Sequence, residues 1–193
     1  MAATPGYVLA ATAGQATAVS LCWIGDAATA VLPTTVSTAL DASLKDIGYV
    51  TQDGATTSTA LSQSDIPVFG STAPVRTIIT QETLTVNLTA LESNKVTEAL
   101  VTRQALSAIT VTTATMSTTR GPGRDALYSV VLDAVDGASS SAFRRVYPKV
   151  RVTNIGDAVI GYNGVIQYPF TFEAYTDGTG VSEYRYTKVT GLT

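Results

Sequence analysis

The feature that most constrains this chain is a strict alternation of side-chain character over residues 83–89, "TLTVNLT". Apolar and uncharged polar residues follow one another with a period of two, which is the repeat of an extended strand. The apolar positions are Leu84, Val86 and Leu88, and the polar positions are Thr83, Thr85, Asn87 and Thr89. The pattern predicts a strand that buries one face and exposes a face without charge.

The rest of the chain favours the same class of structure. Its 193 residues are 45% hydrophobic and only 14% charged, and Thr and Val, which suit strands, are abundant. We expect a mostly β protein, a β-sandwich or split barrel of antiparallel strands, formed as a single domain over 1–193. The expected strands cover 16–24, 47–51, 75–92, 108–116, 126–135, 142–154, 165–177 and 182–190.

Three further segments are expected to differ from strands. Residues 93–103 predict one flanking α-helix, because Ser93 or Asn94 can cap a stripe of buried apolar residues. Residues 1–15 are expected to form an N-terminal arm. Residues 52–74 read as a long polar loop that begins with a tight turn, and "RGPGRD" (120–125) reads as the end of a hairpin.

Several classes of function lack the residues they need. The chain has no histidine, which removes the commonest general base and metal ligand, and its single cysteine, Cys22, reads as a buried thiol. "GPGRD" lacks the Lys-Ser/Thr end of a phosphate-binding loop. The hydrophobic residues 7–24 are interrupted by polar residues, so no membrane span is expected. We expect no enzyme, no cofactor and no metal site.

Two clusters have more than one interpretation. The basic residues Arg144, Arg145, Lys149 and Arg151 suggest either a nucleic-acid patch or, preferably, rim or subunit-interface charges paired with carboxylates. The aromatic residues suggest either a sugar-binding surface or, preferably, core and cross-strand packing, because most recur with a period of two. They are Tyr168, Phe170, Phe172, Tyr184 and Tyr186.

Four segments in order carry a family resemblance. They are "LDASLKDIGYVTQDGATTS" (40–58), "PVRTIITQETLTVNLTALESNK" (74–95), "FRRVYPKVRVTNIGD" (143–157) and "YPFTFEAYTDGTGVSEYRY" (168–186). In order and spacing they resemble the major tail protein, or tail tube protein, of long-tailed non-contractile phages, especially those of actinobacteria. The chain departs from the family at Phe69, where the family often carries a Trp.

The resemblance implies a structural virion protein. Hexameric rings would stack into a tail tube, assembled in the host cytoplasm, that conducts duplex DNA without sequence-specific binding. It also implies a tape measure protein and tail terminator or distal tail proteins as partners. Residues 52–74 would contact a neighbouring subunit or ring, and the interface residues would be Asp53, Gly54, Phe69, Arg76, Arg144 and Arg145.

The physics of a tube is compatible with this reading. The polar face of 83–89 suits a channel through which DNA must slide, because Thr and Asn do not attract phosphates as Lys and Arg do. Thr83, Thr85, Asn87 and Thr89 are therefore the expected lumen-facing residues. The alternative from another class is a monomeric carbohydrate-binding or adhesin-like β-sandwich, whose polar face is ordinary solvated surface.

Overall fold

A computed structural model of the chain describes residues 21–70, 72–113, 115–136, 141–158 and 164–189. The expected N-terminal arm over 1–15 and the start of the strand expected over 16–24 lie outside these residues. The described elements are, in order, β1 (Cys22–Asp26), β2 (Lys45–Asp46), β3 (Val50–Ile66), β4 (Arg76–Ala90), α1 (Lys95–Thr102), the 3-10 turn η2 (Leu106–Ala108), β5 (Thr110–Thr112), β6 (Thr115–Ser117), β7 (Leu127–Asp136), β8 (Ser141–Ile155), β9 (Tyr168–Tyr175) and β10 (Tyr184–Lys188).

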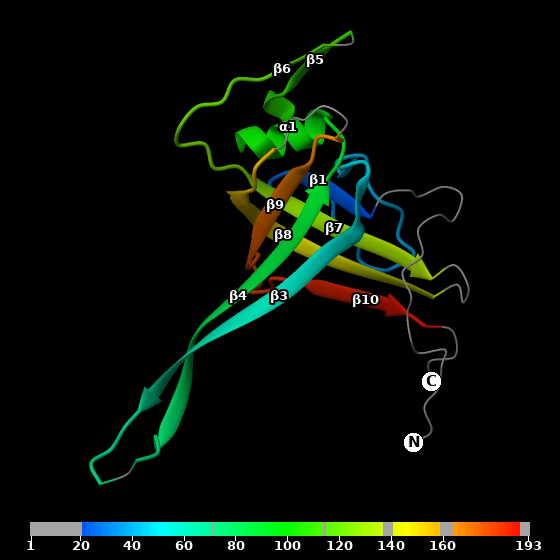
Figure 1. The fold of residues 1–193 in the computed structure, drawn as a ribbon. Helices are drawn as coiled ribbons and strands as arrows, with labels where there is room; N and C mark the ends of the chain where they lie inside the picture. The colour runs from blue at the N-terminus through cyan, green and yellow to red at the C-terminus, as the bar shows by residue number, and fades with distance from the viewer. Residues whose placement is uncertain (1–20, 71, 114, 137–140, 159–163, 190–193) are drawn as a thin grey trace.

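The expected fold class is confirmed. Seven strands follow one another in an antiparallel sheet of order β2-β1-β7-β8-β9-β4-β3, and β10 adds to β8 outside this path. The sheet is open rather than a closed barrel, and α1 is the single α-helix among the described residues. Figure 1 shows the β3–β4 hairpin extending far beyond the body of the sheet.

The long strand β8 divides the sheet into two parts. Its residues 149–155 pair with β9, whereas residues 142–146 pair with β10, so Tyr147 and Pro148 stand where one partner gives way to the other. Proline has no N–H to donate to a ladder, which suits it to this break. On the other side of β8, Ser129 Oγ of β7 donates to the Pro148 carbonyl at 2.7 Å, beside a register shift in the β7–β8 pairing.

The main core lies on one face of the curved sheet. Leu84, Val86 and Leu88 are buried there, as the alternation predicts, while Thr83, Thr85, Asn87 and Thr89 are partly exposed on the other face. The largest fully buried side chains of this core include Tyr128, Tyr147, Phe170 and Phe172. The preference for core packing is therefore confirmed for Phe170 and Phe172. Tyr184 and Tyr186 pack against a second, smaller apolar cluster instead.

The predicted helix over 93–103 is confirmed as α1, which closes one end of the main core. Asn94 caps it by accepting from the N–H groups of Val96 and Thr97, and the Asn94 N–H in turn donates to Thr97 Oγ1. These reciprocal bonds satisfy donors that a helix start leaves unpaired. The helix ends at Arg103, which takes a left-handed conformation with φ of 53°.

The expected loop over 52–74 is wrong for most of its length. Residues 50–66 form β3, which pairs with β4 almost to its tip, and only 67–75 connect the two strands. The expected tight turn at Gln52, Asp53 and Gly54 is instead a bulge, because the pairing jumps from Val50 to Ala55 and Gly54 has a φ of 69°. A Thr/Ser-rich strand that is polar on both faces carries no alternation, so the sequence pattern gave no strand signal.

Two smaller expectations also change. The strand expected over 108–116 is a small hairpin, β5–β6, that forms its own two-stranded sheet beyond α1. "RGPGRD" is consequently a connection to β7 and not a hairpin end, because β6 and β7 do not pair. The segment expected as one or two short strands around Pro148 is one continuous strand, β8.

Candidate functional site

The exposed side of β4 is part of a wider polar surface across three strands, with hydroxyl and amide groups and one carboxylate. Thr56 of β3, Asn87 of β4 and Thr171 of β9 stand in register, and so do Ser58, Thr85 and Glu173. The Ser58 and Thr85 hydroxyls lie 2.7 Å apart and share a hydrogen bond. We call this surface the polar face; it comprises Thr56, Ser58, Thr83, Thr85, Asn87, Thr89, Thr171 and Glu173. The structure thus brings the four expected lumen residues together on one face.

A small group of charges borders the polar face next to β8. Arg151 is in register with Glu173, its Nε lies 2.9 Å from the Asp125 carboxylate, and its guanidinium lies 5.3 Å from the centre of the Tyr175 ring. Both members of the ion pair are about half exposed, so the pair adds little stability. Burial, followed by the charge of Glu173, raises the pKa of Tyr175. The border therefore offers no excess of positive charge for phosphates.

The second candidate surface is the distal part of the β3–β4 hairpin, residues 59–83, which we call the arm. On the N-terminal side of Leu84, β4 pairs with β3 alone, because the pairing with β9 covers only residues 84–90. Large apolar side chains are exposed along it and at its tip, which is unusual for a monomeric surface and marks a site of association. They are Leu61, Ile66, Val68, Phe69, Val75, Ile78 and Ile79.

The expected interface residues are distributed and do not form one site. Asp53 and Gly54 lie in the bulge near the base of the hairpin, Phe69 lies in its connecting turn, and Arg76 begins β4. Phe69 is fully exposed, and none of the described residues covers its ring. These positions span the length of the hairpin, as an extended contact with a neighbour would require.

The two arginines of the expected interface occupy different environments. Arg144 is 5% exposed and lies inside the chain, where it pairs with Asp133 and donates to the carbonyls of Thr35 and Thr38. We therefore assign it to holding the subunit together, and it is not a surface contact. Arg145 is about one-third exposed and lies 3.7 Å from Glu183.

Glu183 is a linking residue that the sequence did not single out. Its carboxylate accepts from Tyr147 Oη at 3.0 Å and from Arg185 Nε at 2.7 Å, and Tyr147 Oη is 3.1 Å from Thr57 Oγ1 of β3. The pairing with carboxylates expected for the basic cluster on β8 is thus present at Arg144, Arg145 and Arg151, whereas the expected rim or interface position is wrong for the buried Arg144. Its partner Arg185 is two residues away, but Tyr147 and Arg145 come from β8, so no local pattern marks Glu183 as a link between segments.

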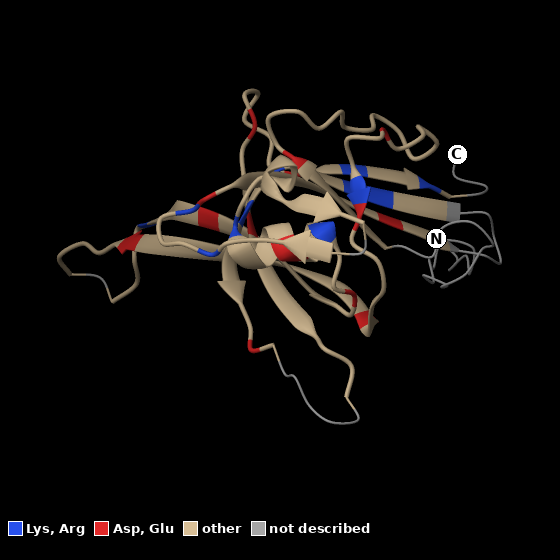
Figure 2. Ribbon diagram, turned by 90° about the horizontal axis from the view of Figure 1, so that it is seen from above, with Lys and Arg blue, Asp and Glu red and all other residues tan. Residues whose placement is uncertain are grey.

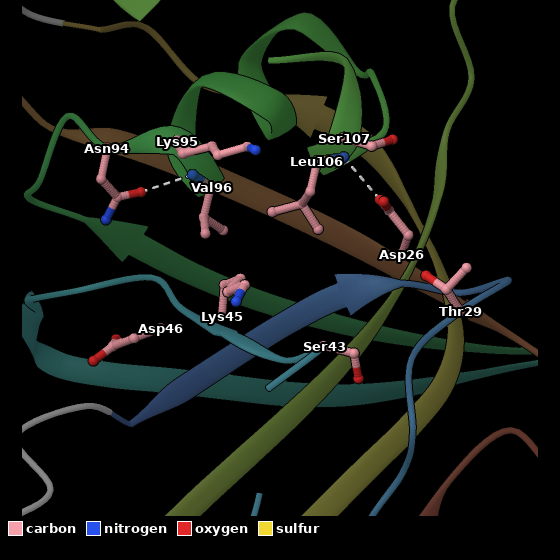
Figure 3. A pocket seen from close by; sticks show the side chains of 10 residues that line it. All are labelled: Asp26, Thr29, Ser43, Lys45, Asp46, Asn94, Lys95, Val96, Leu106 and Ser107. Carbon is pink, nitrogen blue, oxygen red and sulfur yellow. Dashed lines mark hydrogen bonds between the residues drawn. The ribbon is translucent and has the colours of Figure 1, made fainter. Parts of the chain in front are cut away.

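A pocket of about 460 Å³ lies between α1, η2 and the strands β1 and β2. Figure 3 shows Lys45 and Lys95 at this pocket together with Asp26 and Asp46. Both carboxylates already accept backbone bonds, Asp26 from Leu106 N at 2.8 Å and Asp46 from Gly48 N at 2.6 Å. The two carboxylates therefore hold neighbouring backbone segments in place at the pocket. Among the described residues no group of His, Cys, Asp and Glu could hold a metal ion.

Charges are sparse on the ribbon as a whole, and most of it carries none (Figure 2). No helix within the described ranges is long and apolar enough to cross a membrane. In comparison with known proteins, the family model described as phage tail tube protein matches residues 1–187. A search of curated proteins found no match.

Proposed function

Because the chain belongs to the phage tail tube protein family, we propose that six copies form a ring and that the rings stack into the tube that conducts phage DNA. The family makes the chain a structural component of the virion. The polar face is the observation that carries the finer proposal. It is uncharged over most of three adjacent strands, while the opposite side of β4 is buried in the core.

The number of strands available per copy supports a hexamer. If the four contiguous strands β8, β9, β4 and β3 of each copy form the wall, six copies supply about twenty-four strands. At about 4.8 Å between strands and a tilt of roughly 40°, the backbone diameter is about 48 Å. Side chains remove about 10 Å, which leaves roughly 38 Å for a duplex of about 20 Å. Half as many strands would leave no room for DNA.

The polar face would line the lumen in this arrangement. Hydroxyl and amide groups remain wetted and bind phosphate weakly, whereas each Lys or Arg would add a salt-dependent attraction to the DNA backbone. Thr83, Thr85, Asn87 and Thr89 are the lumenal residues of β4 in this proposal, and Ser58 and Thr171 extend the surface onto the neighbouring strands. DNA can then slide without being held.

The hairpin would make the contacts between copies. No described strand pairs with the outer edge of β3, so its backbone groups are open to a neighbouring sheet. Asp53, Gly54, Phe69 and Arg76 would contact a neighbouring subunit or ring, with Arg145 at the subunit rim. Residues 1–193 would act as one tail tube domain, in which residues 1–15 form an N-terminal extension separate from the arm.

Other tail proteins would meet the tube at its ends and inside it. A tape measure protein would occupy the lumen during assembly in the host cytoplasm, and tail terminator and distal tail proteins would bind the two ends. The proposed role requires no catalytic residue and no cofactor, because it rests on shape and surface chemistry.

Size and shape test the proposal directly. Purified protein examined by size-exclusion chromatography and negative-stain electron microscopy should form sixfold rings or hollow filaments. Phe69→Ser should shift the population toward single subunits, because it removes the most exposed apolar side chain of the arm. A wild-type chain that remains a monomer at high concentration would contradict the proposal and favour a carbohydrate-binding β-sandwich.

A further inference from the structure

The arm and the segment 103–124 lie at opposite ends of β4. The arm tip adjoins the first residue of β4, whereas α1, η2 and the β5–β6 hairpin follow its last residue. Figure 1 shows the same arrangement, with the β5–β6 hairpin beyond α1 at one end and the arm tip at the other. The arm residues 76–83 reach about 25 Å past the part of β4 that pairs with β9, at 3.3 Å per residue.

One face of the arm combines exposed apolar and acidic residues. The register places Leu61 opposite Glu82, Gln63 opposite Ile79 and Asp65 opposite Thr77. Leu61 is 51% exposed and Ile79 is 60% exposed. Strand alternation makes this face the continuation of the core side of the sheet, where Leu84 and Val86 are buried. We call it the core-side face of the arm.

The acids of the arm have no cationic partner in their own subunit. Within the described residues, neither Asp65 nor Glu82 has a Lys or Arg at ion-pair distance, and Asp65 accepts only the Thr77 hydroxyl. The arm, residues 59–83, contains Asp65 and Glu82 against Arg76, so its net charge is −2 + 1 = −1.

The segment 103–124, which we call the basic lobe, has the opposite charge. It contains Arg103, Arg120 and Arg124 and no Asp or Glu, so its net charge is +3. No carboxylate of the described part of the chain lies within ion-pair distance of these arginines. The lobe also exposes Val111, at 59%. Each end of the subunit therefore carries an exposed apolar side chain and charges without an ion-pair partner, and these charges have opposite signs at the two ends.

The basic lobe lies on the same side of the sheet as the core-side face of the arm. Leu106 and Ile109 belong to the main core, and Met116 packs against it. A copy displaced along the direction of β4 would thus bring its arm over the neighbour's basic lobe without any rotation of the sheet. Such a contact joins two different patches and can repeat indefinitely, which is the property of a head-to-tail interface.

We propose that the core-side face of the arm docks on the basic lobe of a second copy of this chain in the adjacent ring. Asp65 and Glu82 would neutralise arginines of the lobe, and Leu61 and Ile79 would be covered beside Val111. This inference rests on the proposed function and names the surface that receives the arm. Stacking of rings would then depend on charge, whereas contacts within a ring would depend on other residues.

Charge reversal on each surface tests the docking. Asp65→Lys with Glu82→Lys places like charges against the lobe, and Arg120→Glu with Arg124→Glu does the same from the other side. Each pair of changes should lower the fraction of protein in tubes at least about tenfold at physiological salt, because opposed like charges disfavour an interface. Rings should persist, as measured by sedimentation and electron microscopy. The four changes combined should restore tubes to within about threefold of wild type.

Ser64→Lys is the control for position, because it introduces a lysine next to Asp65 but on the opposite face of the arm. It should leave stacking intact. Circular dichroism and thermal unfolding of each variant would show whether it is folded. Tubes formed equally by all variants, or a combined variant that does not recover, would overturn the inference while the proposed function stands. A wild-type chain that forms no tube would overturn both.

Discussion

Arg144 of β8 and Asp133 of β7 stand opposite each other in the sheet, and Arg144 Nη2 lies 2.6 Å from the Asp133 carboxylate. The same guanidinium donates to the carbonyls of Thr35 at 2.9 Å and Thr38 at 2.6 Å. The pair thereby fastens the 35–38 turn to the sheet beside the apolar cluster of Leu44, Val131 and Val146.

Replacing Arg144 should destabilise the folded subunit. Arg144→Met would leave Asp133 without its cation and two carbonyls without a donor, so the free energy of unfolding should fall by about 3–5 kcal/mol. Urea unfolding of isolated subunits would measure it. Arg185→Met is the control, because Arg185 is 61% exposed and its ion pair should contribute less than about 1 kcal/mol. Equal losses in the two variants would contradict the structural role of Arg144.

Substitutions at adjacent positions of β4 can test which of its two faces is buried. Val86→Asp places an unpaired charge in the core and should prevent folding, whereas Val86→Leu should cost less than about 1.5 kcal/mol. Asn87→Asp adds the same carboxylate one residue away, on the partly exposed face, and should fold normally. Circular dichroism would separate these outcomes. A folded Val86→Asp variant would show that the two faces have been assigned the wrong way round.

The proposed lumen makes a distinct prediction. Thr85→Arg would add one positive charge per subunit to the channel, and each charge near DNA adds an attraction that weakens as salt rises. Tubes should still assemble, but DNA ejection from particles carrying the variant should slow and should recover at higher salt. Thr85→Ser is the matched control. Normal ejection by the arginine variant, or failure to assemble, would move this face out of the lumen.

The turn before β10 should respond to acid. Asp177 accepts from Thr179 N, Thr179 Oγ1, Val181 N and Tyr184 Oη, and these donors hold the pKa of its carboxyl well below the usual range. A lowered pKa in the folded state stabilises the fold above the unfolded value of about 3.9, and this contribution is lost as the pH falls below that value.

The stability difference between wild type and Asp177→Asn should therefore be constant from pH 7 to pH 5 and should shrink below about pH 4. Urea unfolding at several pH values would measure it. Tyr184→Phe removes one of the donors, so the pKa of Asp177 should lie closer to its ordinary value and the loss of stability below about pH 4 should be smaller in that variant. A difference that does not change with pH would mean that the bonds to Asp177 do not stabilise its charge.

The elements that could be predicted are those whose signal is local. The alternation of Leu84, Val86 and Leu88 with polar residues reports a face that is buried along a single strand, and Asn94 marks the start of α1 through bonds to residues two and three positions away. In both cases the residues that cause the structure are neighbours in the sequence.

The arm and the subunit's ion pairs could not be predicted in this way. Strand β3 is polar or exposed on both faces over most of its length, so only its pairing with β4 reveals it. Arg144 resembles any surface arginine until the fold brings Asp133, Thr35 and Thr38 to it. The polar face likewise depends on register, because Ser58 and Thr171 join Thr85 and Asn87 only through neighbouring strands.

A cryo-electron microscopy reconstruction of assembled tubes is the most direct measurement of the central claim. It should show six subunits per ring, a continuous inner wall of about twenty-four strands and the side chains of Thr83, Thr85, Asn87 and Thr89 pointing into an open channel wider than about 20 Å. A tube whose inner wall is built from β7 and β10, or whose channel is too narrow for duplex DNA, would contradict it.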